Sequence, residues 1–356
     1  MKEWRLVMIE KRRLGKSNLH ISVVGMGCWQ YGGGDYWGEQ SQTDVNRVVH
    51  QALDYGVNYF DTAEIYNAGK SEQSLGEALR GRRNEAIIGT KVTPANAYPE
   101  DLRKSCEESL KRLQTDYIDL YMVHWPINPL SIKHFTDDQT TINNPPDIRE
   151  SFNTLETLKK EGKIRNIGIS NHGIKQMTEL QQLEVDIVTN ELPYNLLSRA
   201  IETELIQHCR SKDIGIIGYM PLQQGLLTGK YAIDDIKPTQ ARSRHFHHSR
   251  GEQTRHGEEG AELEIRKALK EITELSQQYD VNLITLSLSW VLSNPNITTT
   301  IVGCRNEGQL EQNLKGASYN MPPELLSKLN NITRPVLDKL GSNPDYYENR
   351  HNNRIY

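Results

Sequence analysis

Short apolar runs alternate with amphipathic stretches along most of this chain. The apolar runs are about five to seven residues long and rich in Ile and Val, as buried strands are. The amphipathic stretches repeat apolar residues at helical spacing, and in 43–55 Thr43-Asp44 can cap a helix with three valines on its inner face. Strands are predicted at 23–28, 57–61, 86–91, 117–123, 164–170, 186–190, 214–219 and 298–302. Helices are predicted at 43–55, 71–81, 99–113, 147–161, 200–212, 261–279 and 283–293.

Each predicted strand is followed by helix-forming sequence. Repeated strand–helix units predict a parallel sheet, and eight of them within this length fit a closed (β/α)8 TIM barrel better than an open sheet. The runs at 7–13 and 19–23 flank a turn-rich break and predict an N-terminal β-hairpin, about 7–23, that caps the bottom of the barrel. No stretch reads as a domain linker, so residues 1–356 are expected to form a single barrel domain.

Three polar segments interrupt the alternation. They are 126–146, 221–260 and a tail from about 335 to 356. Loops of this length inside a compact domain are either functional or disordered. Because 126–146 leaves directly from a strand end, we expect the long loops to stand at the C-terminal face of the barrel and the tail to fold back over its mouth. The glycine run at 32–34 lacks the GxGxxG pattern of a Rossmann domain.

Composition narrows the class of protein further. The formal net charge is −4 over 356 residues, and the sequence pI is about 6.3. This balance gives no reason to expect nucleic acid or an anionic membrane surface as a partner. Four scattered cysteines without a CxxC pair indicate reduced thiols. The N-terminus lacks the apolar core of a signal peptide, and no apolar run approaches the roughly 18 residues of a membrane helix. We therefore expect a cytoplasmic protein.

Three of the predicted strands end in an ionisable residue. Strand 57–61 ends in Asp61, and Tyr66 follows five positions later. Lys91 ends the next predicted strand, and His124 directly follows the one after it. The carboxyl ends of barrel strands meet on one face. We therefore expect these four side chains to converge at the mouth of the barrel.

Such a set is suited to reducing a carbonyl group. A lysine ammonium lowers the pKa of a neighbouring tyrosine from its usual value of about 10. Asp61 would keep Lys91 charged and in place, so that Tyr66 becomes a usable general acid. His124 would hydrogen-bond and orient the carbonyl oxygen. The hydride must come from a cofactor, because no side chain supplies one.

The same residues carry a family resemblance that covers roughly residues 13–330. The chain resembles the aldo-keto reductases in Phe60-Asp61-Thr62-Ala63-x-x-Tyr66, Gly89-Thr90-Lys91 and Val123-His124-Trp125-Pro126. The resemblance implies a (β/α)8 barrel that binds NADPH across its C-terminal face. It also implies Tyr66 as proton donor, Lys91 and Asp61 as the pair that tunes it, and His124 as the group that orients the carbonyl.

Further segments resemble the cofactor contacts of that family. Ser170, Asn171 and Glu191 match the positions that hold the nicotinamide carboxamide, and Tyr219 matches the aromatic residue that stacks on the nicotinamide ring. The pyrophosphate and adenosine contacts correspond to Pro221, Leu222, Gly225, Lys230, Gly303, Arg305, Gln309 and Asn313.

Two of these cofactor positions affect how the nucleotide would bind. Arg305 can pair with a 2′-phosphate through two hydrogen bonds, which favours NADPH over NADH. The family usually has Gln where this chain has Glu191, and an ionised glutamate can accept a hydrogen bond but cannot donate one.

The last predictions concern a substrate pocket and metal binding by the histidine-rich loop. Trp29, Tyr36, Trp37 and Trp125 lie in predicted mouth loops and are candidates for a substrate pocket. His245, His247 and His248 lack a partner motif for zinc, so no metal site is predicted.

Two alternatives to a reductase stay open. One is a nicotinamide-binding redox sensor with little turnover, and the other is an unrelated barrel enzyme that uses Arg305 to anchor a phosphorylated substrate.

Overall fold

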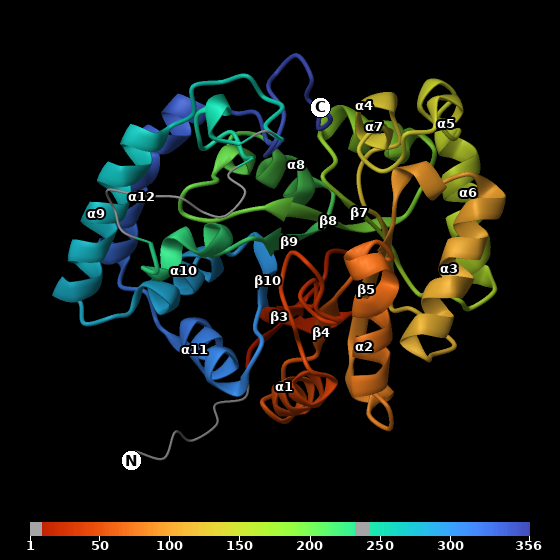
Figure 1. Cartoon of the computed structure of the whole chain (residues 1–356), viewed down its shortest axis with the longest axis horizontal. Coiled ribbons are helices and arrows are strands. Elements are labelled where there is room, and N and C mark those ends of the chain that lie inside the picture. The colour runs from red at the N-terminus through yellow and green to blue at the C-terminus, as the bar shows by residue number, and fades with distance from the viewer. Residues whose placement is uncertain (1–8, 232–241, 252) are drawn as a thin grey trace.

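The computed structural model describes residues 9–231, 242–251 and 253–356. Eight parallel strands close into a barrel in the order β10-β3-β4-β5-β6-β7-β8-β9, with helices around the outside (Figure 1). The strands are β3 (Val24–Gly27), β4 (Tyr59–Asp61), β5 (Ile87–Val92), β6 (Leu120–Val123), β7 (Ile167–Ser170), β8 (Ile187–Pro193), β9 (Gly215–Tyr219) and β10 (Ile297–Gly303). The predicted (β/α)8 barrel is confirmed.

The barrel closes where its last strand pairs with its first, with Ile301 of β10 opposite Gly25 of β3. The helices that follow the strands are α1 (Gln42–Asp54), α2 (Lys70–Ala78), α3 (Pro99–Leu113), α6 (Ile148–Lys160), α7 (Ile174–Gln182), α8 (Leu205–Ser211), α10 (Leu283–Leu292) and α11 (Glu307–Ser318). Two further helices, α9 (Glu262–Gln278) and α12 (Pro323–Leu340), lie side by side outside this ring (Figure 1).

The helices begin close to their predicted positions because polar residues cap them. Ser41 accepts a hydrogen bond from the backbone N–H of Asp44, so α1 begins at Gln42 rather than after a cap at Thr43-Asp44. The buried face of α1 is formed by Val45, Val48, Val49, Ala52 and Leu53. It packs in the large apolar layer between the barrel and its helices.

The predicted hairpin is present and closes the N-terminal end of the barrel. It consists of β1 (Lys11–Arg13) and β2 (His20–Ser22), which pair antiparallel; residues 7 and 8 of the predicted first strand lie outside the described residues. Leu14 and Ile21 are buried in one cluster with residues from inside the barrel. At the tip, a Cβ on Gly15 would lie 2.2 Å from a backbone oxygen of β8, and its φ is +49°. Only glycine fits there without strain.

One of the predicted loops is more structured than the sequence indicates. Segment 126–146 contains α4 (Pro129–Ile132) and α5 (Gln139–Asn143), capped by Asn128 and Asp138. These helices have one turn or little more, too short for an apolar period to reveal them.

The tail begins later than predicted. Helix α12 runs through Pro335 to Leu340, and the tail follows Gly341. Pro335 has no N–H to donate to the carbonyl of Asn331, four positions earlier. It is tolerated because Asn331 is solvent-exposed, so water can hydrogen-bond that carbonyl.

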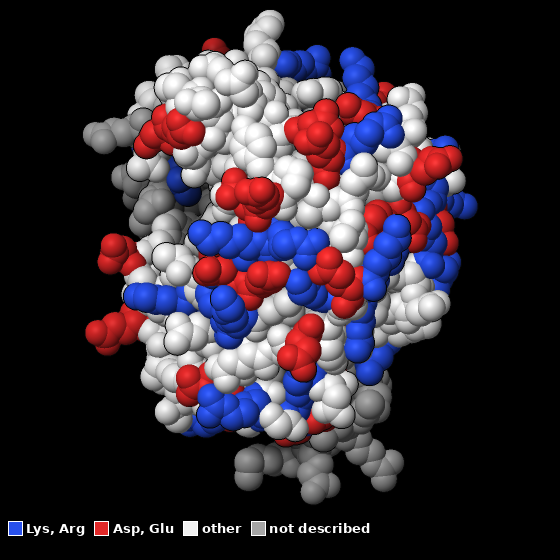
Figure 2. Space-filling view, turned by 90° about the vertical axis from the view of Figure 1, so that its right-hand side faces the viewer, with Lys and Arg blue, Asp and Glu red and all other residues white. Residues whose placement is uncertain are grey.

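The face formed by α3 and α6 carries interleaved charges. Figure 2 shows positive and negative side chains alternating over this side of the molecule. Arg103 of α3 pairs with Glu161 at 2.6 Å, and Lys163 lies between Glu107 and Glu161 at 2.7 and 3.1 Å. A face of this kind holds no extended patch of one sign.

Within the described ranges, no helix has the length and apolar character needed to span a lipid bilayer.

Candidate active site

The four predicted catalytic side chains come together at the C-terminal end of the barrel. Asp61 ends β4, Lys91 lies near the end of β5, and His124 directly follows β6. Tyr66 begins η1, a 3-10 turn (Tyr66–Gly69), and its ring centroid is 5.7 Å from that of His124. The Lys91 ammonium is 5.2 Å from the centre of the Tyr66 ring. The sequence-based prediction of their convergence agrees with this geometry.

Lys91 is the centre of the group and is fully buried, with no exposed side-chain surface. Its ammonium donates to Asp61 Oδ1 at 2.6 Å and to the Thr62 carbonyl at 2.9 Å. It also lies 3.5 Å from Glu191 Oε1. Burial opposes the charge on Lys91, but the carboxyls of Asp61 and Glu191 outweigh it, and the pKa of Lys91 is raised. The charged ammonium form of Lys91 is therefore favoured in this buried site.

The electrostatics of Tyr66 differ in one respect from the sequence-based expectation. Desolvation raises the pKa of Tyr66 above its usual value, and the lowering effect of Lys91 is smaller. Tyr66 is therefore a phenol with its proton in place, which is the form a proton donor needs. The ammonium of Lys91 is still positioned to stabilise the phenolate that remains after the proton has left.

His124 is a neutral imidazole. Burial, with a further contribution from Lys91, lowers the pKa of His124 well below its usual value. Its Nδ1 is buried and has no hydrogen-bond partner among the described residues. A neutral imidazole next to Tyr66 can form a hydrogen bond without adding a charge to the site.

Glu191 is a third acid in this group. It lies in β8, is 3% exposed, and faces both Lys91 and Asp61. Burial, followed by the charge of Asp61, raises the pKa of Glu191 well above its usual value. A raised pKa favours the protonated form of a carboxyl, and a protonated carboxylic acid, unlike a carboxylate, has a hydrogen to donate.

Asn171 connects the nicotinamide-side residues to His124. Its side-chain nitrogen donates to the His124 carbonyl at 3.2 Å and to Ser170 Oγ at 2.9 Å. Its side-chain oxygen accepts from the Tyr219 hydroxyl at 2.8 Å. The backbone of Asn171 is left-handed, with φ of +60°, a conformation that asparagine adopts more readily than most residues. Three of the predicted nicotinamide residues thus form one hydrogen-bonded unit.

The predicted pyrophosphate segment follows β9 in sequence. Pro221 and Leu222 lead into the 3-10 helix η5 (Gln223–Thr228), and Gly225 has φ of +91°. The exposed Lys230 side chain lies over Gly225, where a Cβ would be 2.4 Å from Lys230 Cε.

The predicted adenosine segment lies at the start of α11. Arg305 donates to the Trp37 carbonyl and to Gln40 Oε1 at 2.8 and 2.7 Å, and also to the Glu39 carbonyl. Its own backbone N–H donates to Gln309 Oε1 at 2.8 Å. The strand-end residue Gly303 is exposed. Arg305 is therefore held in place by the loop that follows β3.

Unpartnered polar atoms lie at both ends of the predicted cofactor groove. At the nicotinamide end, Glu191 Oε2 is buried without a hydrogen-bond partner among the described residues. At the adenosine end, the side-chain nitrogen of Asn313 is in the same state, and this residue is 4% exposed. Buried polar atoms are normally satisfied. Two such atoms at the two predicted ends fit a bound dinucleotide.

Three of the four predicted pocket residues gather beside Tyr66. The ring centroid of Trp29 is 5.7 Å from that of Tyr66, 5.1 Å from that of Tyr36 and 5.2 Å from that of Trp37. Trp125 differs, because the guanidinium of Arg354 from the tail covers its ring at 3.6 Å. Trp125 therefore supports the tail instead of forming an open wall.

A polar cavity of about 310 Å³ lies next to segments that adjoin the catalytic residues. It is lined in part by Ile65, next to Tyr66, and by Phe135, whose ring lies 6.1 Å from that of His124. Thr93 and Asn96, which follow β5, contribute polar groups to its wall. This cavity has no counterpart in the sequence-based predictions, because its residues come from three separate segments.

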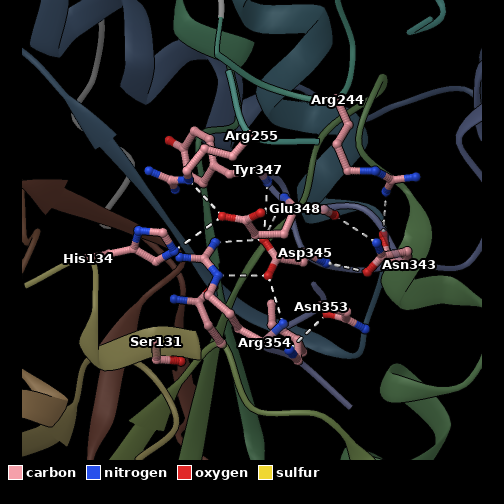
Figure 3. Close-up of polar contacts among 12 residues, drawn as sticks. Ser131, His134, Arg244, Arg255, Asn343, Asp345, Tyr347, Glu348, Asn353 and Arg354 are labelled. Atoms are coloured by element: carbon pink, nitrogen blue, oxygen red, sulfur yellow. Dashed lines mark hydrogen bonds and ion pairs between the residues drawn. The ribbon is translucent and has the colours of Figure 1, made fainter. Parts of the chain in front are cut away.

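The tail returns over the barrel mouth and is fixed by charged groups (Figure 3). Arg354 and Asp345 form a fully buried pair through bonds of 2.8 and 2.6 Å. The buried carboxylate of Glu348 accepts from Arg255 at 2.6 Å and lies 3.2 Å from His134 Nε2. His134 belongs to the 126–146 loop and Arg255 to the 221–260 loop. The expectation that the tail folds back is met, by residues that sequence reasoning did not single out.

The three histidines of the cluster do not share one environment, although the ring centroids of His247 and His248 lie 4.4 Å apart. His245 is buried, and its Nε2 lies 2.9 Å from the Leu197 carbonyl. His247 is half-buried and His248 is exposed. Burial lowers the pKa of His245 to about 4. No group of three potential metal ligands was found in the part of the chain that the structure describes.

Sequence reasoning missed one residue behind the catalytic group. Tyr59 lies two positions before Asp61 on β4, and its hydroxyl is 3.4 Å from Asp61 Oδ2. Strand periodicity of two could have identified it, because residues i and i+2 share a face. Its ring requires the glycines of neighbouring strands, since a Cβ on Gly89 would lie 2.4 Å from the Tyr59 hydroxyl.

Comparison with known proteins is consistent with this geometry. The model of the aldo/keto reductase family matches residues 23–334. The NADH-specific methylglyoxal reductase of Escherichia coli is 31% identical over 334 residues, which are 88% of this chain and 95% of that protein. Aldo-keto reductase YhdN of Bacillus subtilis is 29% identical over 341 residues, which are 91% of this chain and 93% of that protein.

Solved structures give the same result. An aldo-keto reductase from Klebsiella pneumoniae in complex with NADPH superposes with a TM-score of 0.69 and 25% identity, covering 92% of this chain and 96% of that chain. The holo form of an aldo-keto reductase from Bacillus halodurans gives a TM-score of 0.70 and 27% identity, covering 91% and 96%. With a family match over most of its length and the strand-end residues gathered at the barrel mouth, this chain belongs to the aldo/keto reductase family of oxidoreductases.

Proposed function

We propose that this protein reduces an aldehyde or ketone to the alcohol with NADPH, and that Tyr66 is the proton donor. The observation that carries this proposal is the buried Lys91 ammonium, held at 2.6 Å by Asp61 and facing the Tyr66 ring. Family membership leaves no room for the alternative of an unrelated barrel enzyme. The presence of all four catalytic side chains favours turnover over a purely regulatory role.

Each side chain has a distinct part in this proposal. Bound NADPH supplies a hydride to the carbonyl carbon. Tyr66 gives its phenolic proton to the carbonyl oxygen, and the Lys91 ammonium stabilises the phenolate that is left. Asp61 keeps Lys91 charged and fixes its position. The neutral His124 hydrogen-bonds the carbonyl oxygen and orients it towards Tyr66.

The cofactor would lie across the C-terminal face. Ser170, Asn171 and Glu191 would hold the carboxamide, and Tyr219 would stack on the nicotinamide ring. The pyrophosphate would lie along Pro221, Leu222, Gly225 and Lys230, and the adenosine end along Gly303, Arg305, Gln309 and Asn313. The unpartnered atoms of Glu191 and Asn313 support this placement, since each has a hydrogen bond still to make.

The preference for NADPH over NADH rests on Arg305. Its guanidinium has five N–H donors, and three bonds to the loop after β3 use only some of them. The remaining donors suit a 2′-phosphate. The relatives divide on this point, since a solved relative holds NADPH and a curated relative is named as NADH-specific.

Replacing Arg305 with alanine is expected to weaken NADPH binding about tenfold or more, because the charge-assisted bonds to the 2′-phosphate are lost. NADH has no such phosphate and should bind with nearly unchanged affinity. Fluorescence titration with both cofactors measures the two dissociation constants. An equal loss for both cofactors would mean that Arg305 acts only by holding the loop, and a matched Gln40→Ala variant reports that effect separately.

The proposed activity itself is tested by a panel of carbonyl compounds. The aromatic group around Trp29 favours aldehydes and ketones with an apolar or aromatic part. We expect loss of NADPH absorbance with members of this panel, and slower or no reaction with NADH. Tight NADPH binding without any turnover across the panel would instead support the redox-sensor function.

A further inference from the structure

Two carboxyl groups share one ammonium at the centre of this site. Asp61 Oδ1 is 2.6 Å and Glu191 Oε1 is 3.5 Å from Lys91 Nζ, and all three side chains are buried. One positive charge cannot neutralise two buried negative charges, and an unpaired buried charge is strongly unfavourable. One of the two carboxyls therefore keeps a proton.

The surroundings indicate that the proton belongs to Glu191. Asp61 makes the shorter bond to Lys91 and also faces the Tyr59 hydroxyl at 3.4 Å. Glu191 lies farther from the ammonium, and the pKa of its carboxyl is raised by burial and then by the charge of Asp61. The other titratable groups that face Glu191 are the phenols of Tyr59, Tyr66 and Tyr219, none of which is cationic.

The second oxygen of Glu191 receives no hydrogen bond. Its Oε2 is buried and accepts none from the described residues. The carboxyl of Asp61 lies within hydrogen-bonding reach of the Glu191 side chain, so it is the acceptor for the acid hydrogen while no cofactor is bound. The backbone carbonyl of Glu191 is fixed, because it accepts from Asn171 N–H at 2.9 Å and from Ser170 Oγ at 3.1 Å. The Asn171 side chain is already bonded through both its nitrogen and its oxygen. Of the three residues expected at the carboxamide, Glu191 is thus the one whose side chain has an oxygen with no donor, and its hydrogen can be given to an incoming acceptor in place of Asp61.

We propose that Glu191 works as a protonated carboxylic acid with Oε1 facing Lys91, and that on cofactor binding its hydroxyl would turn from the Asp61 carboxyl and donate to the carboxamide oxygen of the nicotinamide. This inference rests on the proposed cofactor site and gives that site a property that glutamine would not have. Glutamine donates the same bond at every pH, whereas Glu191 donates it only while it holds its proton. Affinity for NADPH should therefore fall as the pH rises through the pKa of Glu191.

The matched variant is Glu191→Gln, which keeps the shape and fixes the donor. NADPH dissociation constants are measured by fluorescence between about pH 7 and about pH 10, a range in which carboxyls of ordinary pKa stay ionised. We expect the affinity of the unmodified protein to fall about tenfold, the value of one strong hydrogen bond. Glu191→Gln should show at most a small change over the same range.

Glu274→Gln is the control, because it makes the same chemical change on an exposed residue of α9, outside the proposed cofactor contacts. It should keep the pH dependence of the unmodified protein. Equal pH dependence in the unmodified protein and Glu191→Gln would overturn the proposal, since other groups would then cause it.

Infrared difference spectroscopy of the cofactor-free protein tests the proton directly. The spectrum of the unmodified protein minus that of Glu191→Gln should contain the carbonyl stretch of a protonated carboxylic acid at neutral pH. Should that variant not fold, the same band must vanish from the unmodified protein at the pH where NADPH affinity falls. A carboxylate spectrum at neutral pH refutes the protonated acid. Failure of the unmodified protein to bind any nicotinamide cofactor refutes the proposed function and the carboxamide contact, while the infrared band still reports the proton.

Discussion

Replacing Tyr66 with phenylalanine is expected to lower kcat by about three orders of magnitude, within the usual range for loss of a general acid. The phenylalanine ring can keep the contacts with Trp29 and His124 that hold Tyr66 in place. Only the hydroxyl group, and with it the transferable proton, is removed. Carbonyl reduction is measured with NADPH in excess, and cofactor binding by fluorescence titration.

The control for this prediction is cofactor affinity, which should stay within about a factor of three of the unmodified value, a difference of less than about 1 kcal/mol. A Trp29→Phe variant changes the same stack without touching the proton and should keep most of the turnover. If Tyr66→Phe retained turnover, another group would have to be the proton donor.

Replacing Lys91 with methionine is expected to lower both activity and stability. The loss of the ammonium leaves the Tyr66 phenolate without its counter-charge, and kcat should fall by about two to four orders of magnitude. It also leaves the buried Asp61 carboxylate without the Lys91 ammonium, which lies 2.6 Å away in the unmodified protein. Removing one partner of a buried pair costs about 3 to 5 kcal/mol. Chemical denaturation and steady-state kinetics measure the two effects.

A matched control separates stability from catalysis. Arg112 pairs with the buried Glu72 at 2.6 Å, between the outer helices α3 and α2. Arg112→Met should also destabilise the fold but leave kcat of the folded fraction nearly unchanged. An Asp61→Asn, Lys91→Met double variant should recover part of the stability and none of the activity. Recovery of activity would contradict the role given to Lys91.

The sequence was sufficient for the fold because the barrel repeats one local pattern eight times. Each apolar run was followed by an amphipathic stretch, and the handedness and closure of such units admit few arrangements. The catalytic residues could be predicted for the same reason. Asp61, Lys91 and His124 stand where strands end, and the ends of parallel strands meet on one face.

What the sequence did not reveal depends on contacts between distant segments. The short helices α4 and α5 have too few residues to show a period. The buried Arg354 and Asp345 read as ordinary polar residues of a tail, because charges are normally exposed. The net pKa shift of Tyr66 and the proton on Glu191 follow from desolvation, which requires knowing what surrounds each group.

The single carboxylate of Glu348 has a consequence for anyone who wishes to redesign specificity. Arg255 and His134, from two different mouth loops, both converge on it from their own segments. Replacing one of these segments with that of a relative would leave a buried acidic or basic side chain in the other two without its partner. Such an unpaired buried group costs several kcal/mol of stability. The two loops and the tail therefore form one exchangeable module, and chimaeras of this enzyme should swap all three together.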